Sequence, residues 1–360
     1  MEARQPRMAP GAIYFIEPPL GHLSGGSMYN LEMVKRLERA ALGQTFFHPL
    51  HSPVHELVQH FKAWPSRCVF VLDGLYVSVP EFKASLQQFL PYAPRTYLML
   101  HYLESMNTYY TAQAREALWT DEKPWLRAMQ GIIVPSRQLR EHLARQGIDK
   151  EKIAVASPGM ARVPASRLPH PRILSENDPI TLIAVGTLSR GKGQLEVVHM
   201  LARMQAQHFR LHLVGDCVQN ASYTEEIRAL IQRSHLQETI MLHGSVPQQT
   251  LFELLPRCDL YLSPSSYESY SMATAEAVAH GLPVVAYATG AIGDWIEDGV
   301  NGMLIAPGKP ERFSQALRRL LTERHVLNQL RHNAWARTAH LAFHSWDKTY
   351  SDFLQAFTSE

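Results

Sequence analysis

Short apolar runs alternate with amphipathic segments along this chain, and the alternation predicts an α/β protein. In the first half, strands are predicted at AIYFI, CVFVLD, RTYLMLH, GIIVP and KIAVAS. Two intervening segments, residues 27–40 and 136–146, carry apolar positions at helical spacing. The second half repeats the pattern, with strands predicted at ITLIAVG, RLHLVGD, TIMLHG, DLYLSP, PVVAY and GMLIAP. We therefore expect two α/β halves.

A proline-rich stretch without periodicity, residues 158–180, separates the halves, and we interpret it as a linker. A length of 360 residues also favours two domains. The expected domains cover residues 1–165 and 166–340. Residues 341–360 predict a final amphipathic helix that covers a surface. Its apolar face consists of Trp346, Tyr350, Phe353, Leu354 and Phe357.

The composition limits the partners and the compartment. Lys and Arg number 35 against 33 Asp and Glu, so nucleic acid is not indicated as a partner. Cys68, Cys217 and Cys258 lie in or beside apolar runs, which is typical of reduced thiols. The N-terminal apolar core, AIYFI, is too short for a signal peptide, and no apolar run approaches the length of a membrane span. We expect a cytoplasmic protein with at most peripheral membrane contact.

One β–α–β unit of the second half contains a candidate ligand loop. Residues 259–263 predict a strand, 272–280 an Ala-rich helix that Gly281 ends, and 282–286 the next strand. The loop 264–271 then lies at the carboxyl end of a parallel strand, where open α/β sheets bind ligands. The start of the helix offers N–H groups to an anion.

Two glutamates, Glu268 and Glu276, stand eight positions apart across this loop and helix. They could bind a ligand that the helix start also holds. In the structural alternative, Ser265 and Glu268 form a capping box and Glu276 is an ordinary solvated helix residue. The pair alone does not decide between these interpretations.

A glycine-rich loop with two cations follows the first strand of the second half. Gly186, Gly191 and Gly193 surround Arg190 and Lys192, a composition that lets a backbone approach a phosphate. The order almost matches a P-loop, but Gly193 stands where a P-loop has a Ser or Thr for Mg²⁺. We expect a phosphate-binding loop rather than a nucleoside triphosphatase; a plain tight turn is the structural alternative.

Metal signatures are weak in this sequence. His55 and His60 in HSPVHELVQH would point about 140° apart on a helix, which does not suit zinc. The chain contains no Asp-x-Asp that would hold a metal-bound sugar diphosphate. We expect neither a metal ion nor a cofactor.

Polar residues and glycines also follow strands of the first half. Gly25 and Gly26 lie between the first predicted strand and its helix, a place of close approach by a ligand or by the opposite domain. His101 and Asp73 each end a predicted strand, and Glu104 lies just beyond His101. A satisfied core histidine is the structural alternative for His101.

The stretch from Val185 to Gly308 closely resembles the retaining glycosyltransferases of family four, through GTLSRGKG, LVGD, LHGSVP, DLYLSPSSYESYSMATAEAVAHGLPVVA and GAIGDWIEDGVNGMLIAPG. The first half resembles them through LSGGSMYN, LHYLES and GIIVPSRQLREHLARQGIDKEKIAVASPGM. The resemblance implies the GT-B fold, in which two Rossmann-like domains face each other across a cleft. Residues 1–165 would bind the acceptor, residues 166–340 the nucleotide sugar, and the helix in 341–360 would cross back to the first domain.

The resemblance also implies roles for individual residues. Glu276 would take the ribose hydroxyls, Glu268 the hydroxyls of the donor sugar, and Lys192 the phosphates, while His101 would be the active-site histidine. The other donor-binding residues that it implies are Gly25, Gly26, Thr187, Gly244, Ser245, Val246, Tyr270, Ser271, Met272 and Ala273.

The phosphate loop departs from the family pattern at one position. Relatives carry Arg directly after the first glycine, whereas this chain has Thr187 there and Arg190 three positions later. We expect Arg190 to take over the role of the missing arginine, because it lies in the same loop as Lys192.

The expected function is that of a retaining, metal-independent glycosyltransferase. It would move a hexose-type sugar from a nucleotide diphosphate sugar to an unidentified small-molecule, glycan or lipid acceptor, with Asp73 and Glu104 as candidate acceptor contacts. Two alternatives remain open. One is a nucleotide-sugar epimerase or hydrolase on the same fold, and the other is a catalytically silent nucleotide-sugar-binding protein.

Overall fold

The structure is a computed structural model that describes residues 12–19, 24–160, 168–204, 208–341 and 343–358. Two compact units make up the chain: Met1–Met160 with His344–Glu360, and Ala161–Phe343. The domain boundaries expected from the sequence, after residues 165 and 340, stay a prediction. Each unit is described by itself.

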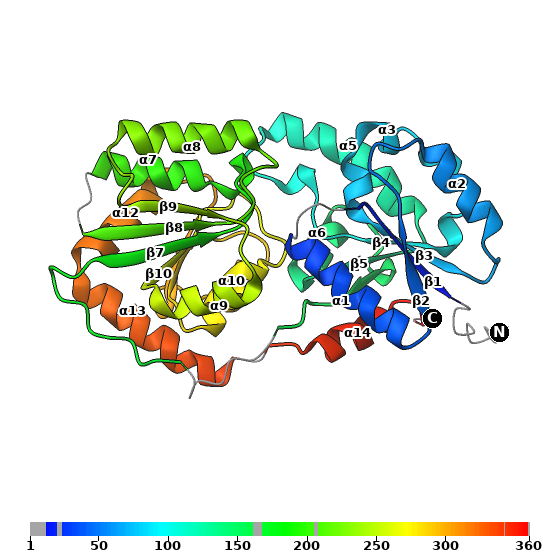
Figure 1. Cartoon of the computed structure of the whole chain (residues 1–360). Coiled ribbons are helices and arrows are strands. Elements are labelled where there is room, and N and C mark those ends of the chain that lie inside the picture. The colour runs from blue at the N-terminus through cyan, green and yellow to red at the C-terminus, as the bar shows by residue number, and fades with distance from the viewer. Residues whose placement is uncertain (1–11, 20–23, 161–167, 205–207, 342, 359–360) are drawn as a thin grey trace. The chain divides into compact units, whose positions relative to one another are not determined.

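The first unit is built on a parallel six-stranded sheet with the order β2-β1-β3-β4-β5-β6 (Figure 1). Its strands are β1 (Ile13–Glu17), β2 (Gly43–Phe47), β3 (Val69–Asp73), β4 (Thr96–Met99), β5 (Gly131–Val134) and β6 (Ile153–Val155). In chain order, β2 pairs with one edge of β1, and β3 then pairs with the other edge, followed by the later strands. The carboxyl ends of β1 and β3 therefore form a topological switch point, the usual ligand position in such sheets.

Helices cover both faces of this sheet because both faces of its strands are apolar. They are α1 (Gly25–Arg39), α2 (Val54–Ala63), α3 (Pro80–Lys83), α4 (Leu86–Phe89), α5 (Ala112–Ala128), α6 (Arg137–Arg145) and α14 (Trp346–Gln355). Phe15 packs with Tyr29 of α1 and Phe353 of α14, whereas its neighbour Ile16 packs with Phe61 and Trp125 on the opposite face. The predicted final helix is thus observed as α14, a part of the first unit.

The second unit is built on another parallel six-stranded sheet, with the order β12-β11-β10-β7-β8-β9. Its strands are β7 (Ile180–Val185), β8 (Phe209–Val214), β9 (Ile240–Gly244), β10 (Leu260–Ser263), β11 (Val284–Tyr287) and β12 (Gly302–Ile305). Its helices are α7 (Gln194–Met204), α8 (Ala221–Arg233), α9 (Gln248–Leu254), α10 (Met272–Ala279), α11 (Ile292–Trp295), α12 (Pro310–Thr322) and α13 (Arg324–Arg337). The switch point of this sheet lies between β7 and β10.

The predicted α/β class is confirmed in both units. In the second unit, α7 and α8 lie on one face of the sheet, and α9 and α10 on the other (Figure 1). The predicted β–α–β unit is present as β10, α10 and β11, with β10 and β11 parallel. Within the described parts of the chain, no helix combines the length and the apolar character needed to cross a membrane.

Candidate functional site

The glycine-rich loop leaves β7 at the switch point of the second unit. Gly186 has a φ of +149°, a short 3-10 helix follows at Arg190–Lys192, and α7 begins at Gln194. The Lys192 stem lies along Gly186, where a Cβ atom would stand 3.7 Å from its Cδ. Its Nζ pairs with Glu268 Oε1 at 2.5 Å. The loop therefore directs one cation toward the loop after β10.

A second set of contacts joins these two loops. The Ser266 backbone N–H and hydroxyl both donate to the Gly191 carbonyl, at 2.8 and 3.0 Å. Gly193 has a φ of +71°, and a Cβ atom there would stand 2.5 Å from the Pro264 carbonyl oxygen. This close approach explains why a glycine occupies the position of the P-loop hydroxyl, since a Ser or Thr would push the loops apart.

The loop that carries Glu268 is also fixed from the other side. Gly290, at a φ of +50°, lies so close that a Cβ atom would overlap the Glu268 carbonyl oxygen. The helix α10 begins only at Met272, with Ser271 as its N-cap residue. The capping box considered for Ser265 and Glu268 is therefore wrong, because Glu268 lies in the loop and its carboxylate pairs with a lysine.

Ser271 places the start of α10 through an unusual backbone conformation. Its φ and ψ are 64° and 70°, a left-handed conformation that costs on the order of 1–3 kcal/mol for a residue with a side chain. Its hydroxyl donates to Thr274 Oγ1 at 2.7 Å and makes no bond that caps the helix. The first N–H groups of a helix have no acceptor within it, so those at Met272 and Ala273 have no intrahelical acceptor.

Glu276 is buried in the middle of α10. Its side chain is 8 % exposed, and Oε1 accepts a hydrogen bond from Gln248 Nε2 at 3.3 Å. Burial raises the pKa of this carboxyl to about 7, although the Gln248 bond acts in the opposite direction. The solvated-helix alternative for Glu276 is therefore wrong. Because Gln248 is the first residue of α9, this bond also ties the start of α9 to α10.

Arg190 points to different partners from Lys192. Its Nη2 pairs with Glu226 Oε1 of α8 at 2.5 Å, and its guanidinium lies 5.6 Å from the centre of the Tyr223 ring. Thr187, at the position where relatives carry arginine, accepts a bond from Gln194 through its carbonyl. The role expected for Arg190 stays a prediction.

In the first unit, polar side chains gather at the carboxyl ends of β1, β3 and β4. Asn30 of α1 donates from Nδ2 to Asp73 Oδ2 at 2.5 Å, and its Oδ1 lies 2.7 Å from His101 Nε2. Because the amide nitrogen of Asn30 faces a carboxylate, its oxygen is the acceptor, and His101 carries its proton on Nε2. Glu17, at the end of β1, joins this cluster electrostatically.

Burial sets the protonation of the cluster. It raises the pKa of Asp73 to about 6 and lowers that of His101 to about 4, so the imidazole is neutral at pH 7. Burial and then the charge of Asp73 raise the pKa of Glu17 to about 7. A Cβ atom on Gly26 would stand 3.0 Å from the His101 ring, so this glycine gives the ring its space.

The two candidate acceptor contacts are held differently. Asp73 is 1 % exposed, and its oxygens accept from Asn30 and from the Leu75 backbone. This makes it a positioning residue, and its predicted contact with an acceptor stays a prediction. Glu104 is half-buried and accepts a hydrogen bond from the Tyr110 hydroxyl at 3.0 Å.

The predicted residues thus fall into two groups. Those of the phosphate loop, the β10–α10 element and residues 244–246 lie at the carboxyl edge of the second sheet, whereas Gly25, Gly26, Asp73, His101 and Glu104 belong to the first unit. Sequence reasoning missed three residues that orient the others: Glu17, Asn30 and Gln248. Across the described ranges, no three His, Cys, Asp or Glu side chains come together in a way that could hold a metal.

Solved structures share this fold over nearly the whole chain. The sucrose-phosphate synthase (tll1590) of Thermosynechococcus elongatus superposes with a TM-score of 0.71 at 19 % identity, covering 96 % of this chain and 97 % of that one. Alr3699/HepE of Anabaena, solved with UDP-glucose, superposes with a TM-score of 0.69 at 17 % identity, covering 97 % and 100 %. The expected GT-B fold is confirmed.

Sequence comparison points to the same class. The family of glycosyl transferases group 1 matches residues 168–337. The D-inositol 3-phosphate glycosyltransferase of Xylanimonas cellulosilytica is 27 % identical over 248 residues, which cover 66 % of this chain and 58 % of that protein. The chain spans about half the length of the curated relatives that it matches.

The fold is that of the GT-B glycosyltransferases, and residues 168–337 match the family of glycosyl transferases group 1. This match lies within the second unit. Membership of family four stays a prediction.

Proposed function

We propose that the protein moves a hexose-type sugar from a nucleotide diphosphate sugar to an acceptor, with retention of configuration. The observation that carries the proposal is the Lys192–Glu268 ion pair just before α10, together with the Glu276 carboxylate buried in that helix. A cation, helix N–H groups and two carboxylates suit the diphosphate, the ribose and the sugar of such a donor. The neighbour HepE, solved with UDP-glucose, supports this class of donor.

Each part of the site has a distinct role in this proposal. Glu276 accepts from the ribose hydroxyls, the N–H groups at the start of α10 hold the diphosphate, and Glu268 accepts from hydroxyls of the sugar. Lys192 leaves Glu268 for the phosphates when the donor binds. Because negative charge grows on the leaving diphosphate as the anomeric bond breaks, Lys192 and the fixed N–H dipoles stabilise the transition state.

The further donor contacts keep the roles that the family resemblance gave them. Gly244, Ser245 and Val246 border the base, and Tyr270 and Ser271 shape the turn around the diphosphate. Tyr270 is held by Trp295, whose Nε1 donates to the Tyr270 carbonyl at 3.3 Å. Fixing the turn before the donor arrives reduces the cost of ordering it on binding.

His101 is the proposed active-site histidine of the first unit. It is neutral, and the chain Asp73–Asn30–His101 fixes its tautomer. A neutral imidazole next to a reacting sugar offers a dipole and adds no positive charge at that position. In a retaining reaction of this kind the departing phosphate accepts the proton of the acceptor, so His101 is proposed to orient and not to take that proton.

The acceptor is proposed to be a small molecule, a glycan or a lipid that the first unit binds. Relatives named D-inositol 3-phosphate glycosyltransferase make that compound the first acceptor to test. Glu104 is the more accessible of the two candidate contacts. The free thiols Cys68, Cys217 and Cys258 support a reducing compartment, and we propose the cytoplasm.

The experiment that tests this function starts from a thermal-shift screen of nucleotide sugars, since a donor at a hundred times its Kd adds roughly 2.7 kcal/mol to stability. The selected donor is then incubated with and without acceptors, and the anomeric configuration of the product is read by NMR. We expect nucleotide to be released only when an acceptor is present, and the product to keep the anomeric configuration of the donor. Turnover without an acceptor favours an epimerase or hydrolase, and binding without cleavage favours a silent protein.

Turnover should be independent of divalent metal ions, because Lys192 and the start of α10 supply the positive charge at the diphosphate. We expect the rate in excess EDTA to stay within twofold of the rate without it. The measurement is nucleotide release from the selected donor. A rate that disappears in EDTA and returns with Mg²⁺ or Mn²⁺ contradicts the proposed site.

Arg190→Ala should lower kcat tenfold or more, about 1.4 kcal/mol, if Arg190 replaces the missing family arginine. Its exposed pair with Glu226 contributes about 0–1 kcal/mol, so the guanidinium can leave it for a phosphate at small cost. Arg203→Ala, on the surface of α7, is the matched control and should leave kcat unchanged. Equal rates for both variants contradict this role, and recovery on adding Thr187→Arg strengthens it.

A further inference from the structure

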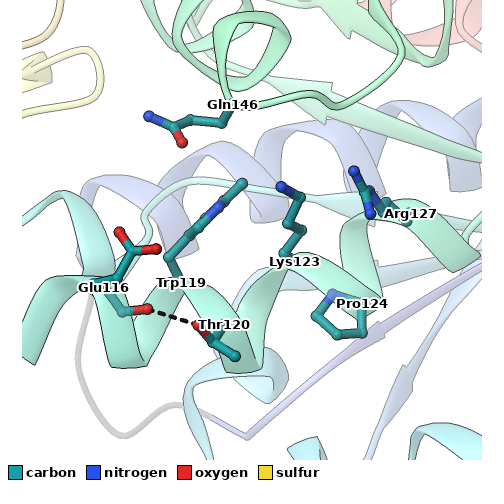
Figure 2. A pocket seen from close by; sticks show the side chains of 7 residues that line it. All are labelled: Glu116, Trp119, Thr120, Lys123, Pro124, Arg127 and Gln146. Atoms are coloured by element: carbon teal, nitrogen blue, oxygen red, sulfur yellow. Dashed lines mark hydrogen bonds between the residues drawn. The ribbon is translucent and has the colours of Figure 1, made fainter.

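A cavity of about 440 Å³ opens on the first unit between α5 and the end of α6 (Figure 2). Its walls include Glu116, Trp119, Lys123 and Arg127 of α5, and Gln146 just after α6. None of these residues has a role in the proposed transfer reaction. The proposed transfer reaction therefore does not account for this cavity.

The cationic end of the cavity lies away from the polar cluster around His101. In a parallel α/β sheet each connecting helix runs back against the strands, so α5 and α6 end near the edge where strands begin. Lys123 and Arg127 lie in the second half of α5, and Gln146 follows the end of α6. The His101 cluster lies at the opposite edge, where the strands end.

Two cations converge in this cavity. A Cβ atom on Gly147 would stand 3.6 Å from Arg127 Nη2 and 3.9 Å from Lys123 Nζ, so both head groups lie beside one backbone position. Figure 2 shows both side chains reaching from α5 toward the segment that carries Gln146. Among the described residues neither cation forms an ion pair; Arg127 donates to the Gly147 carbonyl at 3.4 Å.

The stability of α5 accounts for only one of these cations. Arg127 is in the last turn, where a positive charge interacts favourably with the helix dipole. Lys123 is more than a turn earlier, and its ammonium lies 5.5 Å from the centre of the Trp119 ring. An ammonium held against an indole and next to an exposed guanidinium favours an anion that both can contact.

The opposite end of the cavity has different chemistry. Glu116 lies seven residues before Lys123 on the same helix, which is roughly 10 Å along its axis. A carboxylate accepts hydrogen bonds from hydroxyl groups, while the guanidinium fork and the ammonium suit phosphate oxygens. The two ends together fit a small molecule with a phosphate at one end and hydroxyls at the other.

We propose that this cavity is a binding site for a phosphomonoester that carries hydroxyl groups, separate from the donor site. Lys123 and Arg127 hold the phosphate, the Gln146 amide donates to it, and Glu116 accepts from the hydroxyls. The ligand is either a soluble phosphorylated polyol or the head group of an anionic phospholipid. Both sources present the same chemistry to the cavity.

The test measures binding and uses no transfer activity, so its failure is distinct from a failure of the proposed function. Glycerol 3-phosphate is titrated into the full chain by calorimetry and by tryptophan fluorescence. The double variant Lys123→Gln with Arg127→Gln should weaken binding at least tenfold. Lys123→Arg, which keeps the charge, and Arg145→Gln, an exposed control on α6, should stay within threefold of the parent.

A second readout locates the ligand. The fluorescence change should disappear in Trp119→Phe while calorimetric binding remains. The two sources are separated with phosphatidylcholine vesicles, with and without phosphatidic acid. If the parent binds the acidic vesicles and the double variant does not, the ligand is a lipid head group. If glycerol 3-phosphate binds and the vesicles do not, the ligand is a soluble molecule.

One result overturns the proposal. If neither glycerol 3-phosphate nor the acidic vesicles distinguish the folded parent from the folded double variant, the cavity binds no phosphomonoester. Circular dichroism and thermal melting establish that the double variant is folded.

Discussion

Lys192→Met should lower kcat at least a hundredfold, about 2.7 kcal/mol in activation free energy. Methionine keeps the length of the side chain and removes the charge that faces the leaving diphosphate. Losing one preorganised electrostatic contact to developing charge commonly costs 100- to 1,000-fold. Because this charge grows only as the bond breaks, the loss should appear in kcat more than in KM.

Removing Lys192 also leaves Glu268 without its ion-pair partner, and this second effect must be separated from the first. The double variant Lys192→Met with Glu268→Gln removes both charges and should restore the thermal stability of the parent but not its kcat. Arg203→Ala, on the helix α7 that follows this loop, is the control. A Lys192→Met enzyme whose kcat is within threefold of the parent would falsify the proposed role of this lysine.

Glu276→Gln should weaken nucleoside diphosphate binding by about 1.5–3 kcal/mol at pH 8, the usual value for a hydrogen bond to a charged group. The pKa of about 7 in the unliganded protein means that the carboxyl gains a proton as the pH falls below neutrality. The affinity of the parent for the nucleoside diphosphate should therefore decrease from pH 8 to pH 6. The difference in affinity between the parent and the Gln variant should become smaller over the same range. Calorimetry at both pH values measures this.

The raised pKa of Glu276 also predicts how the stability of the unliganded protein depends on pH. Stability should decrease as the pH rises, whereas the affinity for the nucleotide should increase. A raised pKa means that the folded state holds the proton up to higher pH than the unfolded state does. Stability from this group is therefore present at low pH and is lost as the pH rises from about 4.5 to about 7. Glu276→Gln should melt at a higher temperature than the parent at pH 8. A lower melting temperature together with unchanged affinity contradicts a ligand-binding role.

The sequence predicted the sheets well because buried parallel strands are continuous apolar runs. Its clear omission is β2, whose sequence GQTFF includes no fully buried residue. This strand lies at the edge of the first sheet and pairs only with β1, so it needs no apolar run. Edge strands lack the burial that makes a strand recognisable in a sequence.

The site was predicted where local motifs carry the chemistry and was missed where distant segments meet. Lys192 and Glu268 were each identified, but their pairing depends on how Gly193 and Pro264 pack, which no local pattern encodes. Asn30 gave one usable signal. It stands on the buried stripe of α1 beside apolar residues, and a polar group there requires partners, which Asp73 and His101 provide.

The first unit consists of two separate chain segments, Met1–Met160 and His344–Glu360, and this affects how the protein folds during synthesis. Phe353 of α14 and Phe357 just after this helix complete the apolar core around Phe15 and Tyr97, yet the ribosome delivers them only after the whole second unit. The second unit can therefore finish folding while the first still exposes an apolar face to solvent or to a chaperone. Chains that stall before residue 344 should accumulate with one mature half and one incomplete half, and protein quality control would recognise the incomplete one.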